Sequence, residues 1–387
     1  MSPPSPRRIA DSTFGLATNG FVDGPAQALR DYLIREGARR VVTMSHPLFR
    51  EGETRHEIRI DEPSRATRIR RVPLPCRPPY SYPLDLLVPP WPPAVDAWFG
   101  FNGLAAARGL AARGVGRASR VVYWCVDFVP DRFGAGPITA AYDLVDRLCC
   151  RRSDLRIELS RAARDGRNRR HSASQKAFAP VEIVPMGAWL DRVPQTSADA
   201  IRARRIVYMG HLVERQGVGT LIEALALLTR RGTPVEADIV GRGDLEATLR
   251  QQAVRAGLAD SVRFHGFVPD HRDLERILAT GSIAVAPYAT GGASFTQFAD
   301  PGKLKAYLAA GLPILTTSVP PNTAELVADG GAEVVDDRPE AFAAAIQRLL
   351  SSPDIWRRRR ADALSMARRY DWPSLLEPVA RRLGFRP

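Results

Sequence analysis

The sequence predicts an α/β protein with two doubly wound domains that face a cleft. The first observation is length, because 387 residues exceed one ordinary core of about 150 residues. The second is the alternation of apolar strand-like runs with amphipathic helix-like runs, which is typical of a parallel sheet with crossover helices. The third is a composition of 45% hydrophobic and 25% charged residues, which is that of a globular protein with substantial cores.

The alternation is most regular in the second half of the chain. We expect strands there at 206–209, 236–240, 262–264, 283–287, 313–317 and 332–335. We expect helices at 217–230, 245–256, 272–279, 303–310, from 323 onward, and at 339–350. The first helix has an apolar face at helical spacing, formed by Val218, Leu221, Ile222, Leu225 and Leu228. This order of elements indicates a doubly wound domain.

The first half shows the same alternation with less regular spacing. Its expected strands are 41–44, 94–99, 121–126, 156–159 and 182–184, and its expected helices are 25–36 and 104–113. The segment 187–203 has no apolar period and contains Pro194 and Ser197, so it is the expected linker. We therefore expect domains at 1–190 and 191–368, and a helix in 369–387 that packs back toward the first domain.

Charge, cysteine content and hydropathy limit the classes of function. The net charge of +13 suits phosphates or anionic lipid, although GC-rich coding explains the abundant arginines equally well. No nucleic acid partner is expected, because the arginines are scattered and lack interleaved aromatic residues. The four cysteines have no zinc-ligand spacing and are expected to be core thiols. A polar N-terminus and the lack of any run of about 18 apolar residues predict a cytoplasmic protein.

Several segments of the second half match one enzyme family in order and spacing. They read VEIVPMGAWLD, RRIVYMGHLVERQGVGTLIEALALL, VEADIVGRGDLEATL, SVRFHGFVPDHRDLERIL, SIAVAPY and KLKAYLAAGLPILTTSVPP. Residues 181–372 therefore resemble the nucleotide-sugar half of family-4-type glycosyltransferases, whose GT-B architecture has two Rossmann-like domains facing a cleft. In the first half, the strand pattern and the segment RVVYWCVDFVPDRF resemble the acceptor side of this family.

The resemblance implies transfer of a sugar from a UDP- or GDP-sugar to an acceptor hydroxyl, with retention of configuration. It also implies that no metal and no other cofactor is needed, and the sequence has no Asp-x-Asp run. The expected acceptor is a lipid-linked or cell-envelope glycan precursor, or alternatively a soluble natural product. Two further alternatives stay open, namely a GT-B sugar-nucleotide epimerase and a non-catalytic sugar-nucleotide-binding protein.

Glycine turns after two strands form the first part of the expected donor site. Gly210 ends one strand, and Gly241 and Gly243 follow the next. A tight glycine turn ahead of a helix presents backbone N–H groups to an anion such as a diphosphate. Simple turn geometry is the alternative explanation for these glycines.

The start of the helix expected at 303–310 forms the second part. Asp300, Gly302 and Lys303 stand there, so free amides and the lysine side chain would converge on negative charge. The resemblance implies that this helix start holds the donor diphosphate and that Lys303 is catalytic. The alternative is that Asp300 caps the helix and that Lys303 is a solvated surface lysine.

Two departures from the family pattern concern charge. The positions of the family's arginine and lysine hold His211 and Gln216, so we expect Arg215 to supply the missing catalytic cation. The family's paired glutamates fall on Phe298 and Ala306. We expect the aspartate that precedes the helix to take over their contacts with sugar hydroxyls.

Phe267 and Val268 complete the expected donor site. They follow Gly266 at the turn where the family places the nucleobase against an apolar side chain. A core position is the alternative for Phe267.

The acceptor-side residues are expected in the first half. Asp127 stands at the carboxyl end of strand 121–126, where a carboxylate can orient or deprotonate an acceptor hydroxyl. Its alternative role is a strand-end cap or a salt bridge with Arg132, and we also assign Arg132 to the acceptor side. Asn19 and Gly20 follow the first expected strand, and His46 follows strand 41–44, so these residues join the acceptor-side set.

A basic and aromatic segment predicts peripheral contact with an anionic membrane at its cytoplasmic face. One expected loop carries Arg65, Arg68, Arg70, Arg71 and Arg77 and runs into Tyr80, Tyr82 and 89–93. Each positive charge near an anionic surface contributes about 1 kcal/mol to binding. A solvated loop is the alternative.

Overall fold

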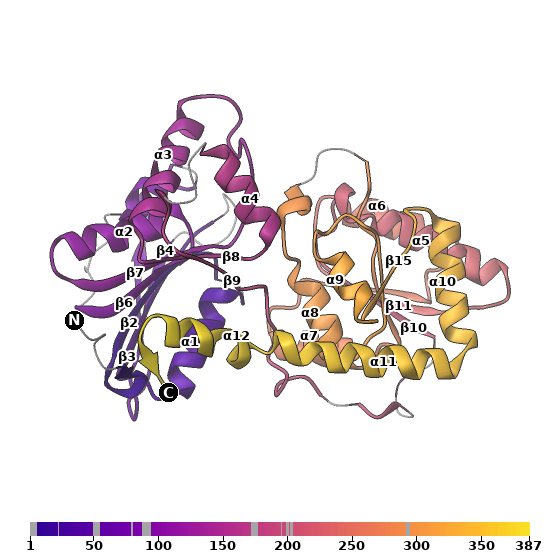
Figure 1. The fold of residues 1–387 in the computed structure, drawn as a ribbon. Helices are drawn as coiled ribbons and strands as arrows, with labels where there is room; N and C mark the ends of the chain where they lie inside the picture. Colours follow the sequence, from indigo (N-terminus) through magenta and orange to yellow (C-terminus); the bar gives the residue numbers. More distant parts are fainter. Residues whose placement is uncertain are drawn as a thin grey trace. The chain divides into compact units, whose positions relative to one another are not determined.

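The computed structural model describes residues 6–387 except 22, 49–54, 79, 87–93, 172–176, 195, 199–200, 202–203 and 292–294. The chain forms two compact units (Figure 1). The N-terminal unit comprises residues 1–185 and 372–387, and the C-terminal unit comprises residues 186–371. The expected domain limits, 190 and 368, lie within about five residues of these boundaries.

The C-terminal unit is built on a parallel sheet with the strand order β12-β11-β10-β13-β14-β15. The strands are β10 (Arg205–Met209), β11 (Glu236–Val240), β12 (Val262–Gly266), β13 (Ile283–Ala286), β14 (Ile314–Thr316) and β15 (Ala332–Val334). The helices are α5 (Val218–Arg230), α6 (Glu246–Arg255), α7 (His271–Ala279), α8 (Gly302–Ala309), α9 (Thr323–Ala328), α10 (Pro339–Ser351) and α11 (Pro353–Ala367). Chain order reverses between β10 and β13, which is the switch point where open α/β sheets bind ligands.

Burial in the C-terminal unit follows the apolar periods of the sequence. The apolar face of α5 is buried and packs with Phe342 and Ile346 of α10 on one face of the sheet. On the other face, Leu304 and Tyr307 of α8 pack with Met366 of α11. The predicted strands and helices of this half are therefore confirmed to within about two residues.

The N-terminal unit contains a larger sheet with the strand order β5-β4-β3-β2-β6-β7-β8-β9. The strands are β2 (Thr13–Asn19), β3 (Arg40–His46), β4 (Arg55–Asp61), β5 (Arg68–Pro73), β6 (Val95–Gly100), β7 (Ala118–Cys125), β8 (Leu155–Glu158) and β9 (Val181–Ile183). The helices are α1 (Pro25–Arg35), α2 (Gly103–Gly114), α3 (Pro137–Arg152), α4 (Arg161–Arg170) and α12 (Trp372–Arg382), with a short 3-10 helix, η2 (Tyr82–Leu86). The C-terminal segment belongs to this unit, because α12 packs on α1 and β16 (Phe385–Arg386) pairs with β1 (Arg7–Arg8).

The sequence-based prediction is wrong at the edge of the N-terminal sheet. β4 pairs antiparallel with β3, and β5 pairs antiparallel with β4. The arginine-rich segment expected to be a loop is therefore an edge strand that carries Arg68, Arg70 and Arg71. Edge strands often carry charged side chains, and here that charge masks the strand period. Residues 89–93, from the same expected membrane contact, lie outside the described residues.

Candidate active site

Glycine turns close the carboxyl ends of β10 and β11 at the switch point. Gly210 and Gly241 have φ angles of +148° and +134°, which side chains other than that of glycine rarely allow. A Cβ on Gly241 would lie 1.9 Å from the carbonyl oxygen of Gly210, and one on Gly243 would lie 2.4 Å from that of Leu212. The amide of Gly210 donates to the carbonyl oxygen of Val240 at 2.9 Å. The backbones of the two predicted glycine turns therefore pack directly against each other, with no room for side chains between them.

Lys303 lies in the first turn of α8, and its side chain reaches the end of β10. Its Nζ donates to Gln216 Oε1 at 2.6 Å and lies 4.6 and 4.9 Å from the ring centroids of Tyr208 and Tyr288. A Cβ on Gly210 would lie 2.6 Å from this nitrogen. Burial lowers the pKa of Lys303 to about 7. The alternative of a solvated surface lysine is therefore wrong.

The amino end of α8 adds to the same region. The helix begins at Gly302, and its N-cap residue, Pro301, makes no side-chain capping hydrogen bond. The first amides of a helix carry partial positive charge and favour an anion. Gly302, Lys303 and the turn at Gly210 therefore suit a phosphate group.

Two arginines and a histidine complete this part of the site. Burial lowers the pKa of His211, and the charges of Lys303, Arg215 and Arg242 lower it further. All three cations are therefore close enough to act on one imidazole, and we call them the cationic cluster. Arg242 was not predicted from the sequence, because the Gly-Arg-Gly segment indicated a glycine turn and gave no sign of where the arginine side chain lies.

Asp300 has a structural role that differs from the helix cap, which was the alternative to its predicted contact with the sugar. Its carboxylate is buried, accepts hydrogen bonds from the Met186 amide at 2.6 Å and from Asn322 Nδ2 at 2.8 Å, and pairs with the buried Lys305. The N-cap of α8 is Pro301, so the capping interpretation is wrong. Contact of Asp300 with a sugar stays a prediction, and protein donors already occupy this carboxylate.

Phe267 lies on the surface just beyond β12. Its side chain is 43% exposed, and the Arg242 guanidinium lies 4.9 Å from its ring centroid. The alternative of a core position is therefore wrong for Phe267. Val268, the next residue, is partly buried against the core. An exposed aromatic ring beside the cationic cluster suits a nucleobase.

In the N-terminal unit, the predicted residues Asn19, Gly20 and His46 lie together at the carboxyl ends of β2 and β3. Asn19 Nδ2 donates to Asp85 Oδ2 at 2.9 Å, and Asn102 Nδ2 donates to Asn19 Oδ1 at 2.5 Å. Gly20 has a φ of +111°, and its amide donates to the carbonyl oxygen of His46 at 2.8 Å. Backbone and amide hydrogen bonds thus fix the loop after β2.

His46 belongs to a buried group with His56 and Asp85. The two Nδ1 atoms lie 2.6 Å apart, and Asp85 Oδ1 lies 3.5 Å from that of His46 and 3.8 Å from that of His56. Burial lowers the pKa of His46 to about 3 and that of His56 to about 4, and it raises the pKa of Asp85 to about 7. Sequence reasoning missed His56 and Asp85, because neither β4 nor η2 was expected.

Asp127 and Arg132 form an ion pair in the loop after β7. The Asp127 side chain is 44% exposed, and its carbonyl oxygen accepts a hydrogen bond from Arg167 Nη2 at 2.7 Å. The salt bridge foreseen as the alternative role of Asp127 is therefore present. The positive charge of Arg132 also lowers the pKa of Tyr82, although burial raises it more. This places the pair close to η2.

A second buried group of the N-terminal unit is paired internally. Arg167 Nη1 lies 2.5 Å from Asp146 Oδ1, and its Nε lies 2.9 Å from Glu158 Oε1. His171 Nε2 lies 2.5 Å from the other oxygen of Asp146, and Tyr123 OH also bonds to Asp146. Four elements, α3, β7, β8 and α4, contribute to this network, which holds the unit together.

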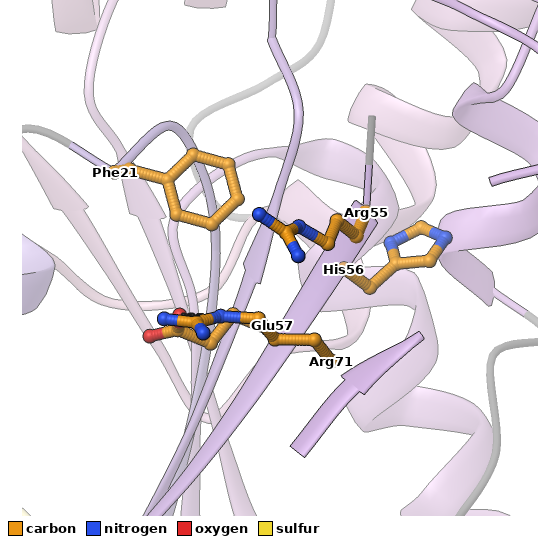
Figure 2. Close-up of a pocket in the computed structure, with 5 residues that line it drawn as sticks. All are labelled: Phe21, Arg55, His56, Glu57 and Arg71. Atoms are coloured by element: carbon orange, nitrogen blue, oxygen red, sulfur yellow. Dashed lines mark hydrogen bonds and ion pairs between the residues drawn. The ribbon is translucent and has the colours of Figure 1, made fainter. Parts of the chain in front are cut away.

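A basic cavity opens on the outer part of the N-terminal sheet. It measures about 270 Å³ and is lined by Phe21, Arg55, His56, Glu57 and Arg71. Figure 2 shows the two guanidinium groups and the Phe21 ring facing this cavity, whereas the His56 ring points away from them. Arg71 Nε donates to Glu57 Oε2 at 3.2 Å. The remaining positive charge suits an anionic ligand.

Comparison with known proteins agrees with the geometry of the C-terminal unit. The fold is that of the GT-B glycosyltransferases: sucrose-phosphate synthase from Thermosynechococcus elongatus superposes with a TM-score of 0.68, at 16% identity, over 96% of this chain and 99% of that one. HepE from Anabaena in complex with UDP superposes with a TM-score of 0.63 over the same shares of the two chains, also at 16% identity. The predicted fold class is confirmed.

Residues 203–352 match the family of glycosyl transferases group 1, so the C-terminal unit carries the domain of that family. A GDP-mannose-dependent alpha-(1-6)-phosphatidylinositol dimannoside mannosyltransferase of Mycobacterium tuberculosis is 30% identical over 181 residues, which are 46% of this chain and 43% of that protein. The alpha-D-kanosaminyltransferase of Streptomyces kanamyceticus is 27% identical over 210 residues, 50% of this chain and 52% of that protein. The chain thus spans about half the length of the curated relatives it matches, and the predicted resemblance is confirmed for its second half.

Proposed function

We propose that this protein transfers a sugar, with retention of configuration, from a nucleotide-sugar donor to an acceptor hydroxyl. The observation that carries the proposal is the Lys303 ammonium group. It is held against Tyr208 and Gln216 beside the Gly210 turn, and no carboxylate of the described residues pairs with it. A partly buried cation with neutral partners is stabilised strongly by a bound anion, and the donor diphosphate supplies one.

The donor is a UDP- or GDP-sugar. Solved structures of similar fold contain UDP, and the mannosyltransferase relative is described as GDP-mannose-dependent. We place the diphosphate at the cationic cluster and the amino end of α8, and the base against Phe267 and Val268. Gly241 and Gly243 let the backbone approach the phosphates closely.

The reaction breaks the bond between the anomeric carbon and the β-phosphate oxygen and forms one to the acceptor oxygen. Negative charge builds on the leaving diphosphate, so Lys303, Arg215 and helix amides lower the barrier by electrostatic stabilisation. The acceptor hydroxyl attacks from the face that the phosphate leaves, which retains the configuration. Its proton passes to the leaving phosphate, and Asp127 orients the hydroxyl.

The acceptor is a lipid-linked or cell-envelope glycan precursor bound by the N-terminal unit at the cytoplasmic face of a membrane. The mannosyltransferase relative is named for a phosphatidylinositol dimannoside, and the basic cavity beside β5 suits an anionic headgroup. Phe21 and Ile69, both exposed, add apolar surface near these arginines. Among the described residues, no helix is long and apolar enough to span a membrane. A soluble natural product is the second candidate acceptor, and the kanosaminyltransferase relative favours it.

A thermal-shift screen of the full-length chain tests the donor assignment. We expect UDP, GDP or their sugars to raise the melting temperature, whereas uridine and guanosine, which lack the diphosphate, should not. Product analysis then separates the reaction classes, because a transferase releases free nucleotide only with an acceptor and an epimerase alters the donor sugar alone. Absence of any shift by all nucleoside diphosphates would contradict the proposal.

Vesicle flotation tests the acceptor assignment. We expect the protein to float with anionic vesicles at low salt, and we expect R68S/R70S/R71S to float less. The matched triple variant R230S/R357S/R358S removes equal charge from exposed residues of the C-terminal unit and should float like the wild type. Equal flotation by both variants, or none by the wild type, would favour the soluble acceptor.

A further inference from the structure

Three potential metal ligands converge inside the N-terminal unit, whereas the residues assigned to the donor belong to the C-terminal unit. His46 ends β3, His56 lies in β4 and Asp85 lies in η2. Their side chains are at most 3% exposed, and one ligand atom from each lies within 4.8 Å of the others. The closest set consists of two imidazole Nδ1 atoms and Asp85 Oδ1, at 2.6, 3.5 and 3.8 Å.

Hydrogen bonding within the described residues leaves this group incompletely satisfied. Asp85 Oδ1 is buried and accepts no hydrogen bond, and the Nε2 atoms of His46 and His56 are buried without partners. The two Nδ1 atoms face each other, so a single proton can lie between them. That proton leaves Asp85 Oδ1 unpaired, whereas one cation bound to both Nδ1 atoms and to Oδ1 satisfies all three atoms, and buried polar atoms are nearly always paired.

The surroundings already orient the carboxylate. Asp85 Oδ2 is held by Asn19 Nδ2 at 2.9 Å, which turns Oδ1 toward the two imidazoles. Metal sites commonly fix a ligand in this way through an outer hydrogen bond. Arg108 Nη1 donates to the Asp85 carbonyl oxygen at 3.1 Å, and its charge disfavours a weakly bound cation. A metal that binds imidazole strongly is therefore required.

The other buried set of similar composition provides an internal comparison. Asp146, Cys150 and His171 also lie within 4.8 Å of one another. There, however, Arg167, Tyr123 and His171 all bond to the Asp146 carboxylate. That carboxylate needs no cation beyond Arg167, so this set is explained without a metal.

We propose that His46, His56 and Asp85 bind one divalent transition metal ion, with Zn²⁺ as the best match. Two imidazole nitrogens and one carboxylate oxygen form a common zinc donor set, with bonds of about 2.0–2.2 Å. Binding would separate the Nδ1 atoms from 2.6 Å to about 3.3 Å, which needs only small side-chain rotations. The ion joins β3, β4 and η2 and braces the loop that carries Asn19 and Gly20. This site is independent of the proposed donor chemistry.

Metal analysis of the full-length protein tests the site. We expect about one equivalent of Zn²⁺ to remain after dialysis, and we expect its removal with EDTA to lower the melting temperature by several degrees. Co²⁺ should replace it and give the visible absorption of a four-coordinate site, and X-ray absorption should show imidazole nitrogens and oxygen around the metal. Retention of less than a tenth of an equivalent, together with no Co²⁺ absorption, would overturn the proposal.

Variants assign the ligands. H56Q and D85N should lose at least tenfold in metal affinity, whereas H171Q, in the comparison set, should retain the wild-type content. Retained metal in H56Q and D85N, or metal lost only in H171Q, would overturn the assignment. If H56Q and D85N do not fold, X-ray absorption on the wild type decides, because a first shell containing sulfur would indicate the set with Cys150.

Discussion

Each unit holds a cation that is shielded from solvent, namely the fully buried Arg167 and the partly buried Lys303, and the two cations have opposite kinds of partners. Arg167 of the N-terminal unit is surrounded by Asp146 and Glu158. Burial disfavours its charge, yet Asp146 and the other acidic groups around it hold its pKa well above the ordinary value. Lys303 of the C-terminal unit contacts neutral groups, and burial lowers its pKa to about 7.

The difference separates a structural charge from a functional one. A cation that is already neutralised by carboxylates stabilises the fold and has little left to offer a ligand. A cation held among aromatic rings and an amide has no counter-charge, so its charged form is destabilised. Binding of an anion stabilises that form. The basic groups that matter for chemistry are thus distinguished by their partners and not by burial alone.

The largest expected effect is the loss of stability when the paired cation is removed. R167M would remove the arginine partner of the buried Asp146 and leave Glu158 with Arg156 alone, so the free energy of unfolding should fall by about 3–5 kcal/mol. Urea denaturation measures the change. R170M on the same helix removes exposed ion pairs with Asp131 and Asp143 and should cost less than about 1 kcal/mol. Equal losses in both variants would contradict the structural role of Arg167.

The second effect concerns turnover and follows from removal of the unpaired cation. K303M should lower kcat about 100-fold or more, because one transition-state donor contributes about 2.7 kcal/mol or more, while thermal stability should stay the same or rise. R230M removes an exposed charge at the end of α5 and should leave both unchanged. Wild-type turnover in K303M would place the diphosphate elsewhere.

The fold of the C-terminal unit was predictable because its signals are local. Parallel strands such as β10 and β13 are mainly apolar runs, and helices such as α5 carry a regular apolar stripe. In the N-terminal unit, α4 has a buried face of Ala163, Gly166 and Arg167, so no apolar period marks it. Its burial depends on carboxylates from α3 and β8, which no local pattern reveals.

The parts of the candidate site that consist of backbone, namely the glycine turns and a helix start, were predictable from the sequence. The turns at Gly210 and Gly241 and the start of α8 follow from glycine and helix signals in the sequence. The ring of Tyr208 comes from strand β10 and that of Tyr288 from the loop after β13, and their contact with Lys303 is visible only in three dimensions. Ala306, at one position of the family's paired glutamates, is packed in the core.

The third effect is the pH dependence of nucleotide binding. In the free protein, Lys303 loses its proton near pH 7, and a bound diphosphate should raise its pKa, so binding above pH 7 takes up about one proton. UDP or GDP affinity should fall by up to about tenfold per pH unit above 7. Burial and the charges of the cationic cluster lower the pKa of His211 from its ordinary value.

Calorimetry in two buffers of different ionisation enthalpy measures this proton uptake. The K303M variant should bind more weakly and take up no proton, whereas R230M should behave like the wild type. Equal wild-type affinity at pH 6.5 and pH 8.5 would show that Lys303 does not sense the ligand.

The smallest expected effect tests whether Phe267, beside the cationic cluster, contributes to nucleotide binding. Its ring is exposed and lies against Arg242, so F267A should weaken UDP or GDP binding by about 1 kcal/mol, at the lower end of base–aromatic stacking energies. Inorganic pyrophosphate, which lacks a base, should bind F267A and wild type equally. V254A, which trims another exposed apolar residue of this unit, is the control. If pyrophosphate binding also falls in F267A, the ring acts by holding Arg242 in place and does not contact the base.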